Sequence, residues 1–222
     1  MIEGKLHILW DVDGTLVDSA PEIIATIRKA LGSVGIDMSK AVKPMRIGPP
    51  VRMVMRNSFQ EDMLSEEQLD EAVKAFRRIY DTSDFADTNP FAGIDDILHD
   101  TRFVHHIITN KPDLPTNRIV AFKGWNDCVA EVLTPNTFDG RLLSKPELFS
   151  YCRNEYPDAW MIGIGDMASD CEAAKVAGID TIGVLWGTGT QKELANAGCK
   201  FIVSSVDELK KMLDYINGHK TI

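Results

Sequence analysis

Two aspartates stand where an apolar run of strand length ends near the start of the chain. The run begins at Leu6, Asp11 and Asp13 end it, and Gly14 and Thr15 follow at once. A buried strand accounts for the apolar run but not for the acidic side chains. Because ligand sites of open α/β sheets lie outside the carboxyl ends of strands, we expect both aspartates to take part in chemistry.

Other polar side chains follow later apolar runs or open later helical segments. Thr109 and Asn110 end one run, Lys145 begins a helical pattern, and Asp166 ends another run with Asp170 four residues further on. The carboxyl ends of parallel strands lie along one edge of a sheet, so groups far apart in sequence converge there. We therefore expect these five side chains to share a crevice with the two N-terminal aspartates.

The types of these side chains are complementary. A cluster of carboxylates repels itself unless a cation lies among them, and hard oxygen ligands suit Mg²⁺. Lys145 offers a point positive charge to a phosphate, while Thr109, Asn110 and the Gly14–Thr15 turn offer hydrogen bonds. Charge neutralisation around a positioned phosphoryl group is what phosphoryl transfer requires. The residues thus predict a phosphoryl-transfer site.

The elements that would position these groups alternate along most of the chain. Strands are predicted at 6–11, 104–109, 129–133, 160–165, 179–185 and 201–203, with helical patterns between most of them. This alternation is typical of a parallel sheet covered on both faces. Residues 16–88 contain no convincing strand, and a capping box at Ser65–Gln68 begins one of their helices. We expect an α/β core with a block of helices inserted after the first strand.

Bulk properties exclude several classes of protein. The 222 residues carry a net charge of −9 without a long Lys/Arg run, which disfavours nucleic-acid binding. No stretch approaches the length of a membrane helix, and the N-terminus lacks the apolar region of a signal peptide. The four cysteines form no C-x-x-C pair, so reduced thiols are favoured over disulfides. A cytoplasmic enzyme or binding protein is expected, and the sequence does not indicate its oligomeric state.

The motifs together resemble those of the haloacid dehalogenase (HAD) superfamily. Asp-Val-Asp-Gly-Thr at 11–15 is similar to the first motif, D-x-D-G-T, and Gly-Asp-Met-Ala-Ser-Asp at 165–170 to the fourth, G-D-x-x-x-D. Thr109 and Lys145 look like the second and third motifs. The resemblance implies a Rossmann-like α/β core formed by residues 1–15 and 89–222. It also implies a helical cap at 16–88, similar to that of phosphoglycolate-phosphatase-like members.

The resemblance implies a role for each aspartate of the first motif. Asp11 would be the nucleophile that forms an aspartyl-phosphate, and Asp13 would protonate the leaving group and then activate water. Superfamily members that are true dehalogenases lack the second aspartate, so its presence favours phosphoryl chemistry. Without the other motifs, a pair of capping residues in a turn would explain both aspartates.

The remaining motif residues would hold the metal and the phosphate. The resemblance assigns Mg²⁺ to Asp11, the backbone carbonyl of Asp13 and Asp166, with Asp170 supporting these ligands from behind. It assigns the phosphoryl oxygens to Thr109, Asn110 and Lys145. Arg46 and Arg52, in the cap, are candidate contacts for a substrate carboxylate or second phosphate, with surface charge as the alternative.

A Mg²⁺-dependent phosphatase acting on a small phosphorylated metabolite is the favoured function. Phosphoglycolate is the favoured substrate, with pyrophosphate or a nucleotide as alternatives. A phosphomutase of the same superfamily is expected to carry a histidine or lysine in its cap. All five histidines lie outside residues 16–88, which favours a hydrolase, although the cap does contain Lys29, Lys40, Lys43 and Lys74. A non-catalytic phosphate- or partner-binding protein is disfavoured because clustered carboxylates are electrostatically costly. Adjacent His105 and His106 would point to opposite faces of a strand and could not share one metal ion.

Overall fold

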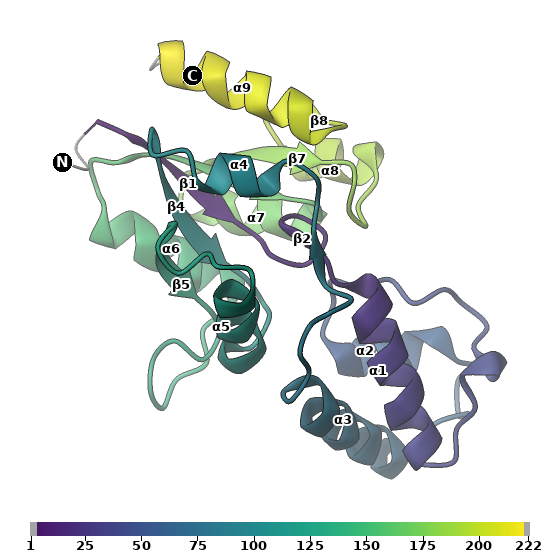
Figure 1. Ribbon diagram of the computed structural model, residues 1–222. Helices are drawn as coiled ribbons and strands as arrows, with labels where there is room; N and C mark the ends of the chain where they lie inside the picture. Colours follow the sequence, from purple (N-terminus) through teal and green to yellow (C-terminus); the bar gives the residue numbers. More distant parts are fainter. Residues whose placement is uncertain (1–3, 220–222) are drawn as a thin grey trace. The chain divides into compact units, whose positions relative to one another are not determined.

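Six of the apolar runs form one parallel sheet in the computed structural model, which describes residues 4–219 (Figure 1). The strands are β1 (Leu6–Trp10), β4 (Phe103–Ile108), β5 (Val129–Leu133), β6 (Trp160–Gly165), β7 (Asp180–Val184) and β8 (Phe201–Val203). Their order is β5-β4-β1-β6-β7-β8, and every pair of neighbours is parallel. The predicted α/β class with a parallel sheet is therefore confirmed.

The central strand β1 is fully buried because it lies between β4 and β6 and is covered on both faces. Trp10, the last residue of β1, is opposite Ile107 on one side and Ile164 on the other, so the three strands end at nearly the same level. This register brings the residues that follow β1, β4 and β6 to one edge of the sheet. That edge carries the predicted chemistry.

Helices α6 (Lys145–Glu155), α7 (Ala168–Val176) and α8 (Gln191–Ala197) pack one against the next. Apolar side chains of α6 and α7 form a core with the strands beneath them, which includes Leu9, Ile108, Leu133, Leu148, Phe149, Met161, Ala173 and Ala174. Helices α4 (Ile94–Leu98) and α9 (Val206–His219) lie together on the opposite side of the sheet from α6 (Figure 1). An ion pair between Lys210 Nζ and Asp96 Oδ2, 2.8 Å long, joins them. Helix α5 (Asp113–Phe122) connects β4 to β5.

The chain divides into two compact units. One comprises residues 1–18 and 90–222 and contains the sheet, and the other comprises residues 19–89. The smaller unit contains α1 (Ala20–Ser33), a 3₁₀ turn at Met38–Lys40, α2 (Val51–Ser58) and α3 (Glu66–Tyr80). Two strands of two residues each, β2 (Val17–Asp18) and β3 (Asn89–Pro90), pair where the chain passes from one unit to the other.

Local signals explain the helices of the smaller unit. The predicted capping box is present at α3, where Ser65 Oγ accepts a hydrogen bond from Gln68 N at 3.1 Å and the Gln68 side chain accepts one from Ser65 N. The buried carboxylate of Glu22 in α1 accepts hydrogen bonds from Thr88 Oγ1, at 2.7 Å, and from the Ser83 hydroxyl. Both bonds tie α1 to the segment that leads back to the sheet.

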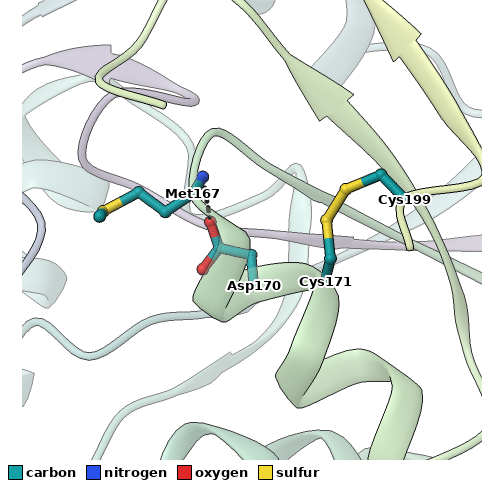
Figure 2. Close-up of a disulfide and its surroundings, with 4 residues drawn as sticks. All are labelled: Met167, Asp170, Cys171 and Cys199. Carbon is teal, nitrogen blue, oxygen red and sulfur yellow. Dashed lines mark hydrogen bonds between the residues drawn. A yellow bond between two sulfur atoms is a disulfide. The ribbon is translucent and has the colours of Figure 1, made fainter. Parts of the chain in front are cut away.

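The pairing of the cysteines differs from the sequence-based expectation. Cys171 in α7 and Cys199 after α8 form a disulfide with their Cα atoms 5.5 Å apart (Figure 2). The prediction of four reduced thiols is therefore wrong for these two residues, while Cys128 and Cys152 are free. The two partners are 28 residues apart and meet because α7 and α8 pack side by side, a contact that cysteine spacing does not reveal.

None of the helices between residues 4 and 219 is both long enough and apolar enough to span a bilayer.

Candidate active site

Strand ends place three of the predicted residues at the carboxyl edge of the sheet. Asp11 follows β1, and its backbone N donates a hydrogen bond to Ile164 O at 2.9 Å. Thr109 follows β4, and its backbone N donates to Leu133 O at 3.1 Å. These bonds continue the ladders one residue past the strands, so the backbone of both residues is fixed. Asp166 follows β6, the other neighbour of β1.

Lys145 joins two of the motif aspartates. It is the first residue of α6 and only 4% exposed, and its Nζ lies 2.5 Å from Asp11 Oδ1 and 2.6 Å from Asp170 Oδ1. Asp170 is also fixed from its other oxygen, because Met167 N donates to Asp170 Oδ2 at 2.9 Å (Figure 2). Residues from three elements that are distant in sequence therefore meet as one chain of charged hydrogen bonds.

Asp166 lies in a tight pocket of backbone. Its carboxylate accepts hydrogen bonds from Thr188 N, at 2.6 Å, and from Thr15 Oγ1, at 3.3 Å. Gly14 and Gly187 pack so closely on this carboxylate that a Cβ atom at either position would collide with it. The Gly-Thr-Gly sequence at 187–189 thus helps to hold Asp166 in place.

Asp13 pairs with a lysine that the sequence analysis did not assign. Lys111 Nζ lies 2.8 Å from Asp13 Oδ1 and 3.0 Å from Oδ2, and Lys111 is only 6% exposed. Its backbone N donates to Thr109 Oγ1 at 3.2 Å, so Thr109 helps to fix the loop that carries it. The position of this lysine, two residues after Thr109 at the same strand end, was the signal that could have identified it.

Burial makes two of the carboxylates, those of Asp11 and Asp166, difficult to ionise. Burial raises the pKa of Asp11 to about 7; the ammonium of Lys145 works against this rise, while Asp170 and Asp166 add to it. Burial also raises the pKa of Asp166 to about 6, although the hydrogen bond from Thr188 N opposes the shift. For Lys145, burial disfavours the charge, but the carboxylates of Asp11 and Asp170 outweigh it and raise the pKa above its ordinary value. The site therefore favours additional positive charge.

Three of the carboxylates are arranged as metal ligands could be. Asp11, Asp166 and Asp170 each offer an oxygen atom, and these atoms lie within 4.8 Å of one another. Three carboxylates beside the single ammonium of Lys145 leave an excess of negative charge. A donor set made only of oxygen suits a hard divalent cation such as Mg²⁺. The residues present therefore fit the metal that the motifs imply.

Other predicted residues lie outside this cluster. Asn110 is exposed at the surface, next to the buried Thr109. Arg46 is exposed in the smaller unit, and Arg52 in the same unit forms ion pairs with Glu66, at 2.7 Å, and with Asp70. Arg52 thus contributes to the packing of α2 on α3, which is the surface-charge alternative raised from the sequence.

Known proteins resemble the whole chain. A family model described as haloacid dehalogenase-like hydrolase matches residues 8–184. The chain is 25% identical to a phosphoglycolate phosphatase of Psychrobacter arcticus over 228 residues, covering 96% of each protein. It is 28% identical to the tyrosine-protein kinase PtkA of Mycobacterium tuberculosis over 220 residues, covering 95% of this chain and 73% of PtkA. The crystal structure of a predicted phosphatase from Clostridium acetobutylicum superposes with a TM-score of 0.78 at 27% identity, covering 95% and 99% of the two chains.

The family match spans residues 8–184, which include every residue from Asp11 to Asp170. The four motifs therefore all lie inside the matched range. The chain is an enzyme whose relatives include phosphatases, and it belongs to the haloacid dehalogenase-like hydrolase family.

Proposed function

We propose that the protein is a Mg²⁺-dependent phosphatase that hydrolyses a small phosphorylated metabolite through an aspartyl-phosphate on Asp11. The observation that carries this proposal is the meeting of Asp11, Lys145 and Asp170 within hydrogen-bond distance, with Asp166 beside them. Such a cluster combines a carboxylate nucleophile, a fixed cation and oxygen ligands in one buried place. These are the groups that phosphoryl transfer requires.

Asp11, Asp166 and the backbone carbonyl of Asp13 would hold the Mg²⁺, with Asp170 keeping Lys145 and the ligands in position. When bound, the cation would neutralise the carboxylates and the phosphoryl oxygens. Burial raises the pKa of Asp11 to about 7, and a nucleophilic carboxylate has to be ionised, so a cation bound beside Asp11 would favour the form that reacts. Lys145 supplies a second positive charge, 2.5 Å from the nucleophile.

In the first step, an oxygen of Asp11 would attack the phosphorus atom of the substrate. A bond forms between that oxygen and phosphorus, and the bond from phosphorus to the substrate oxygen breaks. The leaving oxygen takes the electron pair of the broken bond and a proton from Asp13, so an alcohol departs. Lys111 would act as a positioning residue here, because it holds both oxygens of the Asp13 carboxylate.

In the second step, water would attack the phosphorus atom of the aspartyl-phosphate. Asp13 accepts a proton from the water, the bond between Asp11 and phosphorus breaks, and inorganic phosphate leaves. Thr109 would bind phosphoryl oxygens through its hydroxyl, and it already fixes the backbone of Lys111 at 3.2 Å. Asp11 and Asp13 are both restored at the end of the cycle.

Substrate choice would belong to the smaller unit, residues 19–89. We propose that it is a cap whose closure excludes water and completes the pocket, as lids do in many enzymes. Phosphoglycolate is the favoured substrate because several relatives, including that of Psychrobacter arcticus, carry the name phosphoglycolate phosphatase. Arg46 is the remaining candidate contact for a substrate carboxylate.

Hydrolysis of an aryl phosphate, measured with Mg²⁺ and after removal of metal with EDTA, tests the reaction. We expect activity that is lost with EDTA and restored by Mg²⁺, and a covalent phosphate on Asp11 after acid quench. A panel of phosphorylated metabolites, including phosphoglycolate, pyrophosphate, nucleotides and hexose phosphates, then tests the substrate. Undiminished activity in EDTA, or in Asp11→Asn, would refute the mechanism.

The match to PtkA favours one second candidate function, transfer of a phosphoryl group to tyrosine. The same nucleophile and cation could receive a phosphoryl group and pass it to a hydroxyl instead of water. Incubation with ATP and a tyrosine-containing peptide separates the two functions. Phosphotyrosine would support the kinase, and release of inorganic phosphate without peptide labelling would support the phosphatase.

A further inference from the structure

A second group of potential metal ligands lies between the sheet and α6 and shares no residue with the candidate active site. It comprises His106 of β4, Glu131 of β5 and Cys152 of α6. The ring nitrogen, carboxylate oxygen and sulfur that they offer all lie within 4.8 Å of one another. His106 and Cys152 are fully buried, and the Glu131 side chain is 25% exposed.

Two of these ligand atoms are buried polar atoms that lie near each other. His106 Nδ1 and Glu131 Oε2 are 3.7 Å apart, and neither takes part in a hydrogen bond with any residue of the described part of the chain. Leaving buried polar atoms unsatisfied costs free energy, and such atoms are rare in native structures. A positive charge placed between them would satisfy both.

The other nitrogen of the His106 ring is already fixed. His106 Nε2 shares a hydrogen bond of 3.0 Å with His7 Nδ1, and the two rings stack with centroids 5.0 Å apart. When His106 Nε2 is the donor, Nδ1 carries a free lone pair directed toward Glu131. Metal-binding histidines characteristically hold their second nitrogen in such a bond, which sets the tautomer and the ring orientation.

The neighbouring histidine does not belong to the group. His105 lies on the opposite face of β4, where its Nδ1 accepts a hydrogen bond from Trp10 Nε1 at 3.1 Å. The expectation that adjacent His105 and His106 point to opposite faces is therefore confirmed. His106 instead finds partners on β5 and α6, which the sequence alone did not bring together.

We propose that His106, Glu131 and Cys152 bind a zinc-class transition-metal ion. Nitrogen and sulfur donors suit Zn²⁺ or Co²⁺ and disfavour Mg²⁺ and Ca²⁺. A thiolate and a carboxylate balance the two charges of the ion, and the thiol proton is released to solvent on binding. In a tetrahedral zinc site a nitrogen and an oxygen ligand are about 3.3 to 3.5 Å apart, so a small movement would bring His106 Nδ1 and Glu131 Oε2, now 3.7 Å apart, to that spacing.

The Glu131 side chain is 25% exposed as a whole, although its Oε2 atom is buried. Two of the three elements that carry these ligands, β4 and α6, also position residues of the candidate active site. Strand β4 ends just before Thr109, and α6 begins with Lys145. A bound ion would thus brace the junction of β4, β5 and α6 and stabilise the fold without joining the reaction.

Titration of Co²⁺ into the metal-free, reduced full chain tests the site, because a thiolate ligand gives cobalt a charge-transfer absorption band. We expect the band to saturate at one equivalent and to disappear when Zn²⁺ is added in excess. Cys152→Ser should abolish the band, and Glu131→Gln should weaken binding about tenfold or more. Glu131→Gln alters a partly exposed side chain, so it tests the site even where Cys152→Ser does not fold.

Matched variants separate this site from other binding. Cys128→Ser, the double variant Cys171→Ser/Cys199→Ser, and Glu155→Gln on the exposed part of α6 should each keep the band. Asp166→Asn should also keep it, because that residue belongs to the other cluster. Absence of the band in the unmodified chain, or a full band in Cys152→Ser or in Glu131→Gln, would overturn the proposal.

Discussion

At the scale of single residues, the main feature of the candidate active site is its excess of negative charge. Asp11, Asp166 and Asp170 are held together by buried backbone and by one lysine, and burial raises the pKa values of Asp11 and Asp166 to about 7 and about 6. Folding thus places carboxylates where they are hard to ionise. Such an arrangement is costly for stability and useful for binding a cation and a phosphate.

Asp11 is the residue on which the proposed reaction depends most. Asp11→Asn removes the nucleophile and keeps the size of the side chain, so we expect kcat to fall roughly 10³-fold or more at saturating Mg²⁺. Steady-state hydrolysis of an aryl phosphate measures the effect. Asp158→Asn, an exposed aspartate beyond α6, is the control and should keep its activity. Equal loss in both variants would contradict a specific role for Asp11.

Asp13 should matter in proportion to the need of the leaving group for a proton. Asp13→Asn is expected to lower kcat about 10²- to 10⁴-fold for an alkyl phosphate, the usual contribution of general acid–base catalysis. The decrease in the rate of the first step should be much smaller for an aryl phosphate, because its leaving group is acidic and needs no proton. Rapid-quench measurement of aspartyl-phosphate formation with both substrates tests this difference. An equal effect on both would argue against proton donation by Asp13.

The stability of the metal-free protein should depend on pH through Asp11. Its pKa is about 7 in the folded protein and 3.8 ordinarily, so between these values the folded state binds a proton that the unfolded chain has lost. The free energy of unfolding therefore falls as pH rises from about 4 to about 7. Asp166, with a pKa of about 6, acts in the same direction.

Urea denaturation of wild type and Asp11→Asn in EDTA, across this pH range, isolates the effect of Asp11. The variant lacks the titrating group, so it should gain stability relative to wild type as pH rises. Excess Mg²⁺ should raise the stability of the wild type most at the upper end of the range. A difference between the two proteins that does not change with pH would contradict the prediction.

At the scale of elements, the sequence predicted what depends on local pattern. The strand after Leu6 and the helix after Ser144 were recognisable because burial of a central strand requires an apolar run and helix starts carry cap residues. Helix α4 was missed because five residues are too few to show a helical period. The two-residue strands β2 and β3 were missed because their pairing is a long-range contact.

The predicted site residues were likewise those with a motif or a strand end to mark them. Lys111 and Thr188 were not assigned because their partners, Asp13 and Asp166, lie far away in sequence. The Cys171–Cys199 pair depends on how α7 packs against α8, which no local pattern encodes. All three contacts thus depend on tertiary packing and not on the local conformational preferences of the sequence.

Gly187, in the loop after β7, tests whether the close packing of this loop on Asp166 matters for metal binding. A Cβ at Gly187 would collide with the carboxylate of Asp166 and with the Gly14 carbonyl, both of which are fixed by their surroundings. We expect Gly187→Ala to weaken the apparent affinity for Mg²⁺ about tenfold or more, measured by activity as a function of Mg²⁺ concentration. The free energy of unfolding should fall by about 1 to 3 kcal/mol.

Gly32→Ala is the matched control for this change. Gly32 lies within α1, and apart from its chain neighbours and the nearby backbone of its own helix, a Cβ there would meet no described atom within 4 Å. Alanine should stabilise the helix by up to about 1 kcal/mol and leave the dependence on Mg²⁺ unchanged. If Gly187→Ala likewise left the dependence on Mg²⁺ unchanged, the close packing of Gly187 on Asp166 would not matter for metal binding.

At the scale of the whole molecule, the motif residues all belong to one of the two units. Asp11, Asp13, Lys145, Asp166 and Asp170 lie in residues 1–18 and 90–222. The smaller unit, residues 19–89, has its own packed helices. Chemistry and the proposed control of substrate choice are thus encoded in separable parts of the chain.

This separation predicts the outcome of removing the smaller unit. Because β2 pairs with β3, the chain ends created at residues 18 and 89 lie side by side, and a short Gly/Ser linker can join them. The joined protein should keep a Mg²⁺-dependent hydrolysis of aryl phosphate. It should lose discrimination, so that kcat/KM values for a panel of phosphorylated metabolites differ by less than about tenfold, because lid closure no longer selects among them.

The control for this experiment is the same linked protein carrying Asp11→Asn, which should be inactive and equally folded by circular dichroism. Activity that depends on Asp11 but is indifferent to substrate would place specificity in residues 19–89. If the linked protein instead ranked the metabolites as the full chain does, specificity would reside in the sheet unit itself. Selection would then have to come from residues near Lys111 and Thr109, which lie at the same edge as the nucleophile.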